Sequence, residues 1–400
     1  MINTKDKISV VCLSNQAWDF ELWTNKKHIM SELKDRLVNV LYVDPPLRYK
    51  ILIKILKKRI SIKQLFVPVT DNKNLKVFSP FRLSLVSKVS YFMPVLDHLY
   101  IYYTAFVINK FLKNTKGKKV LWVYHVSFPG LEKLLSLVQY DLLIYDLVDD
   151  YATMPEFSNI STNKWLINRE NWLIKKSDII FTSAPGLFNK YSKLKNNVYY
   201  IPNAGAFEIF SNTKNLSLPD AMKPIVDSGK KIVGFTGALD AYKVNLDLVQ
   251  KLVEFYPDFN FVFVGPINLS DNTKNLEKLK LLHNVFLLPS VPKPELASYY
   301  KFFDTYIIPY NLNQYTKGCF PVKFFDALSS RLPVVVTNMQ AYSDYRQVCC
   351  VAKDDNEFIE LVKTSILENT VKKQEERVKI ASVNTWSNKL DKQLKIICSD

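Results

Sequence analysis

Short apolar runs alternate along the chain with longer segments in which apolar positions recur every three or four residues. The short runs are rich in Val, Ile, Tyr and Phe, which is typical of strands buried on both faces of a parallel sheet. In the first half they lie at 8–13, 38–43, 75–78, 119–124, 142–147, 179–182 and 198–201. The helical pattern occupies 23–36, 97–113, 164–176 and 186–193. This alternation predicts a parallel sheet covered by helices.

The same alternation restarts after a polar segment at 211–229, which we interpret as a linker or long loop because it contains Pro219 and Pro224. Strands are expected at 232–235, 261–264, 285–288, 305–308 and 334–336. Helices are expected at 245–255, 294–301, 322–330, 355–368, 371–381 and 385–397.

The predicted fold class is therefore α/β, with two Rossmann-like domains whose parallel sheets face each other across a cleft. We expect an N-terminal domain at 1–205, a C-terminal domain at 206–384, and a last helix at 385–400 that packs back toward the N-terminal domain. Ligands of such sheets bind outside the carboxyl ends of the strands. A ligand held between the two domains is the natural expectation.

Most of the positive charge lies in the first half. The 400 residues carry a formal net charge of +16, and residues 1–200 hold 30 Lys and Arg against 16 Asp and Glu. The densest part is a helical pattern near 48–63 that has apolar residues on one face. Such a helix is typical of an anionic membrane surface. The residues predicted to contact it are Lys50, Lys54, Lys57, Lys58 and Arg59.

The basic segment near 48–63 and the apolar stretch at 83–112 each allow two interpretations. The basic helix could instead be a solvated helix packed on its own domain. The apolar stretch at 83–112 predicts a buried helix pair or a shallow membrane-dipping element, because charged residues and a proline interrupt it. No run of 18 apolar residues is present, so we expect no membrane-spanning helix.

Several classes of function are disfavoured. The five Cys are scattered and only four His are present, so neither a disulfide framework nor a metal site is expected. Only eight of the 54 basic residues are Arg, which disfavours nucleic acid as a partner. The first residues lack the pattern of a signal peptide, so we expect a cytoplasmic protein associated with the inner face of the cell membrane.

The most informative segment is 307–336, in which a strand, a polar loop and a helix follow one another. Pro321 is well placed as the first residue of that helix, and Lys323 and Asp326 share one of its faces. This pattern favours a nucleoside diphosphate site in which Lys323 neutralises phosphate and Asp326 accepts from ribose hydroxyls. An ordinary surface Lys–Asp pair would have the same spacing.

The ordered motifs resemble those of GT-B glycosyltransferases of the family 4 group, especially bacterial enzymes of teichuronic acid and capsular polysaccharide type. The helix motif reads Pro321-Val-Lys323-Phe-Phe-Asp326 and is followed by Arg331-Leu-Pro333-Val-Val. Other matches follow in order: Tyr145-Asp-Leu-Val-Asp149-Asp150, Lys176-Ser-Asp178-Ile-Ile-Phe-Thr-Ser183, Pro202-Asn203-Ala-Gly and Gly234-Phe-Thr-Gly237. Together they cover about residues 140–340.

The resemblance implies transfer of a sugar from a nucleotide-sugar, with UDP favoured, to a hydroxyl of a lipid-linked or growing bacterial surface polysaccharide. No cofactor and no metal are implied. The expected catalytic residues are His125, Asp150 and Lys323. The expected donor contacts are Thr236, Gly237, Lys243, Thr316, Pro321, Val322, Lys323 and Asp326. The expected acceptor contacts are Asn15, Gln16, Trp18 and Asp149.

Two other functions stay open. The pattern of the family would place an acid near 318, where this chain has Gly318, and it has Glu where this chain has Asp326. Ala238 and Arg331 also stand at positions where the family usually has Arg and Gly. These departures allow a non-catalytic homologue that acts as a binding or scaffold partner. A sugar-nucleotide epimerase of the same fold is the third candidate, although it would need more carboxylates and His.

Overall fold

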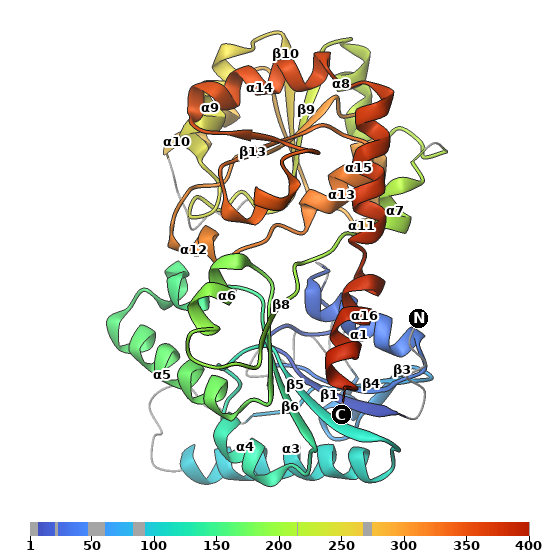
Figure 1. The fold of residues 1–400 in the computed structure, drawn as a ribbon, viewed down its shortest axis with the longest axis vertical. Coiled ribbons are helices and arrows are strands. Elements are labelled where there is room, and N and C mark those ends of the chain that lie inside the picture. Colours follow the sequence, from blue (N-terminus) through green and yellow to red (C-terminus); the bar gives the residue numbers. More distant parts are fainter. Residues whose placement is uncertain are drawn as a thin grey trace.

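The computed structural model describes residues 7–20, 23–46, 61–82, 93–213, 215–266 and 274–399. The chain forms two lobes stacked end to end, one from each half of the sequence (Figure 1). Each lobe is built around a largely parallel sheet covered by helices. The α/β class with two parallel-sheet domains is therefore confirmed.

The N-terminal lobe contains an eight-stranded sheet in the order β3-β4-β2-β1-β5-β6-β7-β8. Apolar strands fill its centre because both faces are covered, and β1 and β6 are almost wholly buried. Its strands are β1 (Ile8–Leu13), β2 (Asn39–Val43), β3 (Val69–Asn72), β4 (Leu75–Phe78), β5 (Lys118–Val123), β6 (Leu142–Leu147), β7 (Ile179–Thr182) and β8 (Val198–Tyr200). Its helices are α1 (Asn25–Asp35), α3 (Met93–Lys113), α4 (Leu131–Leu137), α5 (Ile160–Lys176) and α6 (Pro185–Tyr191).

The C-terminal lobe contains a six-stranded parallel sheet in the order β11-β10-β9-β12-β13-β14. Its strands are β9 (Lys231–Thr236), β10 (Phe259–Val264), β11 (Val285–Leu288), β12 (Thr305–Ile308), β13 (Val334–Thr337) and β14 (Cys350–Ala352). Its helices are α9 (Leu246–Phe255), α10 (Lys274–Lys280), α11 (Lys293–Tyr300), α12 (Gln314–Lys317), α13 (Lys323–Ser329), α14 (Asp355–Leu367) and α15 (Val371–Val383).

Every predicted strand is present, with ends that shift by at most two residues. Among the described residues, two strands, β3 and β14, and five helices escaped prediction; the helices are α4, α7 (Phe207–Ser211), α8 (Lys223–Asp227), α10 and α12. The interpretation of 211–229 as a linker or long loop was wrong in part. It contains a 3-10 turn at Asp220–Met222 and α8 (Lys223–Asp227), because Met222 and Ile225 are buried against the lobe.

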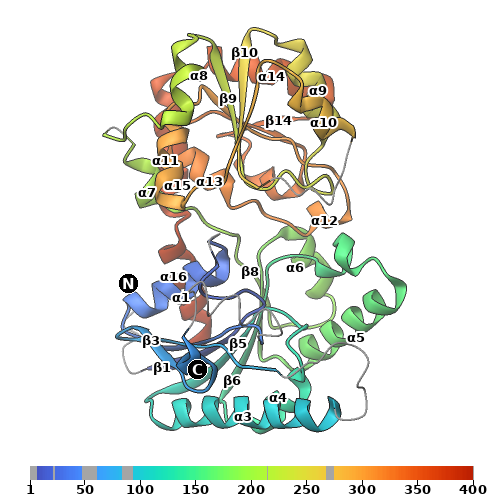
Figure 2. The ribbon, with the colours of Figure 1, turned by 180° about the vertical axis from the view of Figure 1, so that it is seen from behind.

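The last helix, α16 (Trp386–Ile397), crosses from the C-terminal lobe and lies beside α1 (Figures 1 and 2). Arg36 on α1 forms an ion pair with Asp391 at 2.5 Å. The Gln393 amide donates to the buried carboxylate of Asp146 at 3.3 Å. The Lys389 ammonium donates to the Ile201 carbonyl at 2.9 Å. Helix α16 therefore fastens the end of the chain onto the N-terminal lobe.

Two predicted membrane-related segments have different outcomes. The residues Lys50, Lys54, Lys57, Lys58 and Arg59 lie outside the described residues. In the apolar stretch at 83–112, the described part from residue 93 onward is one continuous helix, α3, so no helix pair is seen there. Within the described ranges, no helix combines the length and the apolarity needed to cross a bilayer.

Candidate active site between the two lobes

A cavity of ≈ 370 Å³ lies where the carboxyl ends of strands from both sheets meet. Val148 and Asp149 come just after β6, Thr236 ends β9 and Gly237 follows it, and Tyr310 follows β12. This is the place where ligands bind to open parallel sheets. The other lining residues are Trp23, Thr24, Asn25, Lys26, Asn203, Ala238, Lys243, Val291, Lys293, Leu296, Tyr315, Cys319, Phe320, Pro321, Val322, Lys323 and Asp326.

Eight of the predicted site residues line this cavity: Asp149, Thr236, Gly237, Lys243, Pro321, Val322, Lys323 and Asp326. They come from positions up to 177 residues apart in the sequence. Their roles stay predictions, but the fold brings them together.

The Lys323 side chain lies under the loop that follows β9. Its ammonium is 4.0 Å from the centre of the Phe235 ring and 5.4 Å from that of Tyr310. Gly237 has a φ of 111°, and a Cβ there would come within 2.7 Å of the Lys323 Nζ. Glycine therefore gives Lys323 room and permits the backbone angle.

Burial first, and the nearby positive charge of Lys243 second, lower the pKa of Lys323 to about 7. Cys319, Asp240 and Asp326 oppose this shift. Because the pKa of this ammonium lies so close to neutral pH, an anion in the cavity would strongly stabilise its charged form. Burial also raises the pKa of the Cys319 thiol to about 12, so that thiol stays neutral.

Lys243 sits on the same wall and already has a carboxylate partner. Its Nζ lies 3.1 Å from Asp240 Oδ2, and the Tyr242 and Tyr315 rings are close by. Burial acts to lower the pKa of Lys243, but Tyr242 and the carboxylates of Asp240 and Asp149 raise it above its usual value. Lys243 therefore remains charged throughout the physiological range.

Asp326 is tied to protein groups on both of its oxygens. Oδ1 accepts from the Ala206 backbone N–H at 2.8 Å, and Oδ2 lies 3.1 Å from Lys293 Nζ. Lys293 also lies 3.4 Å from the His28 ring, which stacks on Trp386 with centroids 4.4 Å apart. Asp326 thus anchors the start of the second lobe and orients Lys293, in addition to lining the cavity.

Lys26 is a cavity residue that sequence reasoning missed. It stands in the first turn of α1 and is buried, with its ammonium 5.7 Å from the centre of the Tyr124 ring. Burial lowers the pKa of Lys26, and the charge of Asp149 opposes this. Among the 54 basic residues of the chain, nothing in the local pattern distinguishes Lys26.

Lys26 and Lys323 share an unusual feature. Within the part of the chain that the structure describes, neither ammonium makes a hydrogen bond or an ion pair. Lys26 is buried and Lys323 is half-buried. Charges withdrawn from water in this way are normally paired, because removing a charge from water is costly. Two unpaired ammonium groups, one from each lobe, therefore make the cavity a site for an anion.

The two consecutive aspartates after β6 point to different environments. The Tyr315 hydroxyl donates to Asp149 Oδ1 at 3.0 Å across the lobe interface, and burial raises the pKa of Asp149. Asp150 does not line the cavity and pairs with Lys190 at 3.1 Å. A Cβ at Gly318 would lie 2.7 Å from the Asp150 Cβ. This close approach leaves no room for an acidic side chain at 318.

The other predicted residues lie outside the cavity lining. His125 is buried beside Tyr151, with ring centres 4.0 Å apart, and burial followed by the charge of Lys26 lowers its pKa to about 3. It is therefore neutral at physiological pH. Its Nδ1 accepts from the Ser127 backbone N–H at 2.9 Å, so only Nε2 could act toward a substrate.

Thr316 and the residues after β1 have structural partners. The Thr316 side chain completes a capping box with Asn313 at the start of α12. Gln16 accepts from the Thr24 hydroxyl, and Asn15 is exposed. Trp18 lines a separate cavity of ≈ 360 Å³ with Asp19, Lys27, Gln64, Val69, Thr70, Asp71 and Val77.

The lobes also contact each other directly beside the cavity. Asn25 donates to Asn203 at 2.6 Å, and Asn203 donates to the Phe320 carbonyl at 2.9 Å. Helix α12 contacts α6, where a Cβ at Gly186 would lie 2.2 Å from the Lys317 carbonyl oxygen. Across the described ranges, no group of three or more His, Cys, Asp or Glu residues is placed to hold a metal ion.

Comparison with known proteins agrees with this geometry. Residues 220–382 contain most of the residues that line the cavity from the C-terminal lobe. This segment matches the family model "Glycosyl transferases group 1". TuaH of Bacillus subtilis, named as a teichuronic acid biosynthesis glycosyltransferase, is 30% identical over 226 residues. That match covers 54% of this chain and 55% of the relative, so the chain spans about half the length of the curated relative that it matches.

Solved structures resemble the whole chain. Sucrose-phosphate synthase from Thermosynechococcus elongatus superimposes with a TM-score of 0.71 at 10% identity over 98% of both chains. HepE from Anabaena, solved with UDP and glucose, superimposes with a TM-score of 0.63 at 13% identity over 97% of this chain and 98% of the other. The chain therefore has the GT-B fold, and residues 220–382 form a glycosyl transferases group 1 domain.

Proposed function

We propose that this chain is a glycosyltransferase that moves a sugar from a nucleotide-sugar, with a UDP-sugar favoured, to a hydroxyl of a lipid-linked or growing bacterial surface polysaccharide. The observation that carries the proposal is the pair of unpartnered ammonium groups, Lys26 and Lys323, on facing walls of the cavity between the lobes. The group 1 domain and the likeness to TuaH support the same reaction class.

The chemistry follows from where negative charge develops. As the bond between the sugar and the nucleoside diphosphate breaks, the departing pyrophosphate gains charge, and preorganised cations stabilise that charge in a site with little water. Lys323 and Lys243 stand on the wall that would hold the pyrophosphate. Because α13 has only seven residues, the two lysines rather than the end of the helix carry this part of the proposal. No step requires a metal ion.

The acceptor would approach from the N-terminal lobe. Asp149 lies on that wall, and its raised pKa suits a carboxyl group that exchanges a proton with a hydroxyl. Lys26 is close enough to Asp149 for their charges to interact. The membrane-facing part of the proposal, at Lys50, Lys54, Lys57, Lys58 and Arg59, rests on the sequence pattern alone.

Donor binding is tested first by thermal shift with UDP, GDP, dTDP and their sugars. We expect UDP and a UDP-sugar to raise the melting temperature of the wild type. The Lys323→Met variant should lose this shift, because its side chain keeps the apolar length but not the charge. Lys363→Met is the matched control, since Lys363 is exposed on α14.

Turnover then separates the candidate functions. The best binder should be consumed, with release of the nucleoside diphosphate, when an extract containing the lipid-linked acceptor is added. Tight binding without transfer or hydrolysis would favour the scaffold function instead. Conversion of the sugar without an acceptor would favour an epimerase. An equal thermal shift in Lys323→Met and the wild type would remove the basis for the donor site.

A further inference from the structure

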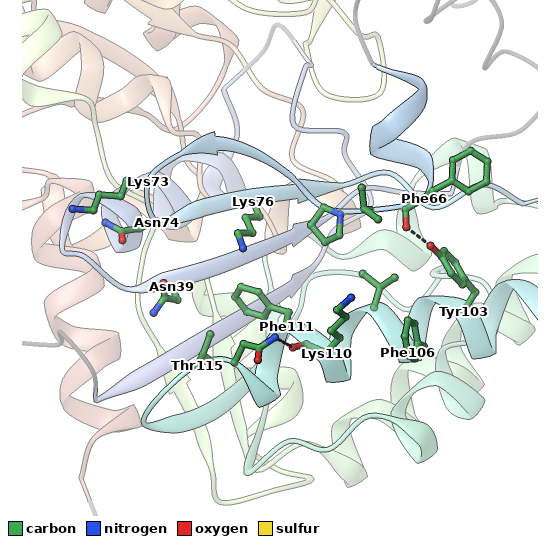
Figure 3. A pocket seen from close by; sticks show the side chains of 14 residues that line it. Asn39, Phe66, Lys73, Asn74, Lys76, Tyr103, Phe106, Lys110, Phe111 and Thr115 are labelled. Atoms are coloured by element: carbon green, nitrogen blue, oxygen red, sulfur yellow. Dashed lines mark hydrogen bonds between the residues drawn. The ribbon is translucent and has the colours of Figure 1, made fainter.

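A second cavity, of ≈ 270 Å³, lies in the N-terminal lobe between the β3–β4 hairpin and helix α3 (Figure 3). Helix α3 runs along the end of this lobe that is farthest from the C-terminal lobe (Figures 1 and 2). The cavity therefore belongs to a different part of the molecule from the proposed donor site, and the function proposed above gives it no role.

The charged residues that line this cavity all have the same sign. They are Lys73 and Lys76 from the hairpin and Lys110 from α3, and no Asp or Glu in the part of the chain that the structure describes contributes to the lining. Figure 3 shows Lys76 and Lys110 pointing toward each other across the gap. Among the described residues, none of the three ammonium groups has an ion-pair partner. Like charges that face each other without a counter-ion attract an anion.

The other end of the cavity is aromatic and exposed. Phe66 and Phe106 expose 54% and 60% of their surface, and the Tyr103 hydroxyl donates to the Phe66 carbonyl. Leu99 and Tyr102, on the same helix, are also largely exposed. Large apolar side chains that gather beside a cavity mark an interaction surface.

The cavity has a polar end and an aromatic end, which is the arrangement that an amphiphilic ligand would match. Asn39, Lys73 and Asn74 lie at one end, Phe66, Tyr103 and Phe106 lie at the other, and Lys76 and Lys110 stand between them (Figure 3). The cavity is slightly smaller than the roughly 300–1,000 Å³ of most small-molecule pockets. It therefore suits one part of a larger molecule whose remainder stays outside. Aromatic rings at the boundary of a bilayer commonly occupy this position beside basic residues.

We propose that this cavity binds the headgroup of an anionic membrane phospholipid, with Lys76 and Lys110 on the phosphate, Lys73 at the polar end and the aromatic end inserted at the bilayer boundary. The lobe would then sit on the membrane by the α3 end. None of the lining residues belongs to the basic segment near 48–63. Occupancy of the cavity can be measured without any sugar transfer.

The test is co-sedimentation of the full chain with vesicles of phosphatidylcholine alone or mixed with phosphatidylglycerol. The wild type should bind the mixed vesicles and not the neutral ones. In Lys76→Glu/Lys110→Glu, affinity for the mixed vesicles should fall at least about tenfold, because each basic residue near an anionic surface contributes about fivefold. The double variant Lys353→Glu/Lys363→Glu is the matched control, with the same change of charge on the C-terminal lobe.

A second pair of variants tests the aromatic end. Phe106→Ser should weaken vesicle binding, whereas Phe255→Ser, at a residue equally exposed in the C-terminal lobe, should not. Circular dichroism and melting temperature check that every variant is folded. Wild-type-like binding by Lys76→Glu/Lys110→Glu would assign the membrane contact to another surface and overturn the proposal. Equal binding of the wild type to neutral and anionic vesicles would overturn it as well.

Discussion

Donor binding should depend on pH through the ammonium of Lys323. In the free protein the pKa of this group is lowered to about 7, chiefly by burial and then by Lys243. A bound pyrophosphate would place negative charge beside the Lys323 ammonium and so stabilise its protonated form. The free protein must therefore take up a proton to bind once the pH exceeds that pKa, and affinity should fall as pH rises.

The magnitude follows from the fraction of free protein that carries the proton. With a pKa of about 7, that fraction drops from about nine-tenths at pH 6 to about one-tenth at pH 8, so the dissociation constant should rise about tenfold. At pH 7, binding should take up about half a proton per ligand. UDP-glucose is a suitable probe, because its pyrophosphate does not titrate in this range.

The assay is isothermal titration calorimetry at several pH values in buffers of different ionisation enthalpy, which reports affinity and proton uptake together. Lys323→Met should bind more weakly at pH 6 and should lose most of the pH dependence. Lys363→Met should behave as the wild type. Equal affinity of the wild type at pH 6 and pH 8, or an unchanged slope in Lys323→Met, would refute the role given to this ammonium.

Two predictions concern the scaffold of the site. Gly234→Ala should destabilise the chain by about 1–3 kcal/mol through overpacking, because the new Cβ would lie 2.1 Å from the Phe303 ring; urea unfolding measures this, and an unchanged midpoint would contradict the packing of β9. Tyr315→Phe should lower the free energy of unfolding by about 1–2 kcal/mol, since it leaves the partly buried Asp149 without its hydroxyl donor at 3.0 Å. Thermal unfolding measures that loss, and a variant as stable as the wild type would show that this contact between the lobes is not made in solution.

Some departures from the family pattern have a structural explanation. Gly318 packs against Asp150 so closely that an acid at 318 would not fit. Arg331 follows the end of α13 with a φ of 67°, a conformation in which glycine is usual. The chain therefore keeps the backbone turn at 331 at some conformational cost. Asp326, on α13, accepts a hydrogen bond from the Ala206 backbone N–H and forms an ion pair with Lys293.

The buried framework could be predicted from the sequence because its signal is local. A strand covered on both faces is made almost entirely of apolar residues, and β1, β6, β7 and β12 each contain a single polar residue. The missed strand β3 reads Val-Thr-Asp-Asn and is mostly exposed. It exists because it pairs antiparallel with β4 at the edge of the sheet. Pairing partners of that kind are not encoded in hydrophobic periodicity.

The residues of the candidate site likewise fall into two groups, those that the sequence predicted and those that only the tertiary structure revealed. Gly237 and Asp149 were predicted because they stand in motifs at the carboxyl ends of predicted strands, where parallel sheets bind their ligands. Lys323 was predicted from the motif that begins the helix at Pro321, and Lys243 was predicted as a phosphate contact without a motif of its own. Lys26 and Lys293 belong to no such motif. Their importance comes from burial and from neighbours far away in the sequence: Asp326 for Lys293, and the opposite lobe for Lys26. An isolated lysine in a sequence is a solvated charge. Only the tertiary structure withdraws these two from water, leaving Lys26 without a counter-ion and giving Lys293 the carboxylate of Asp326.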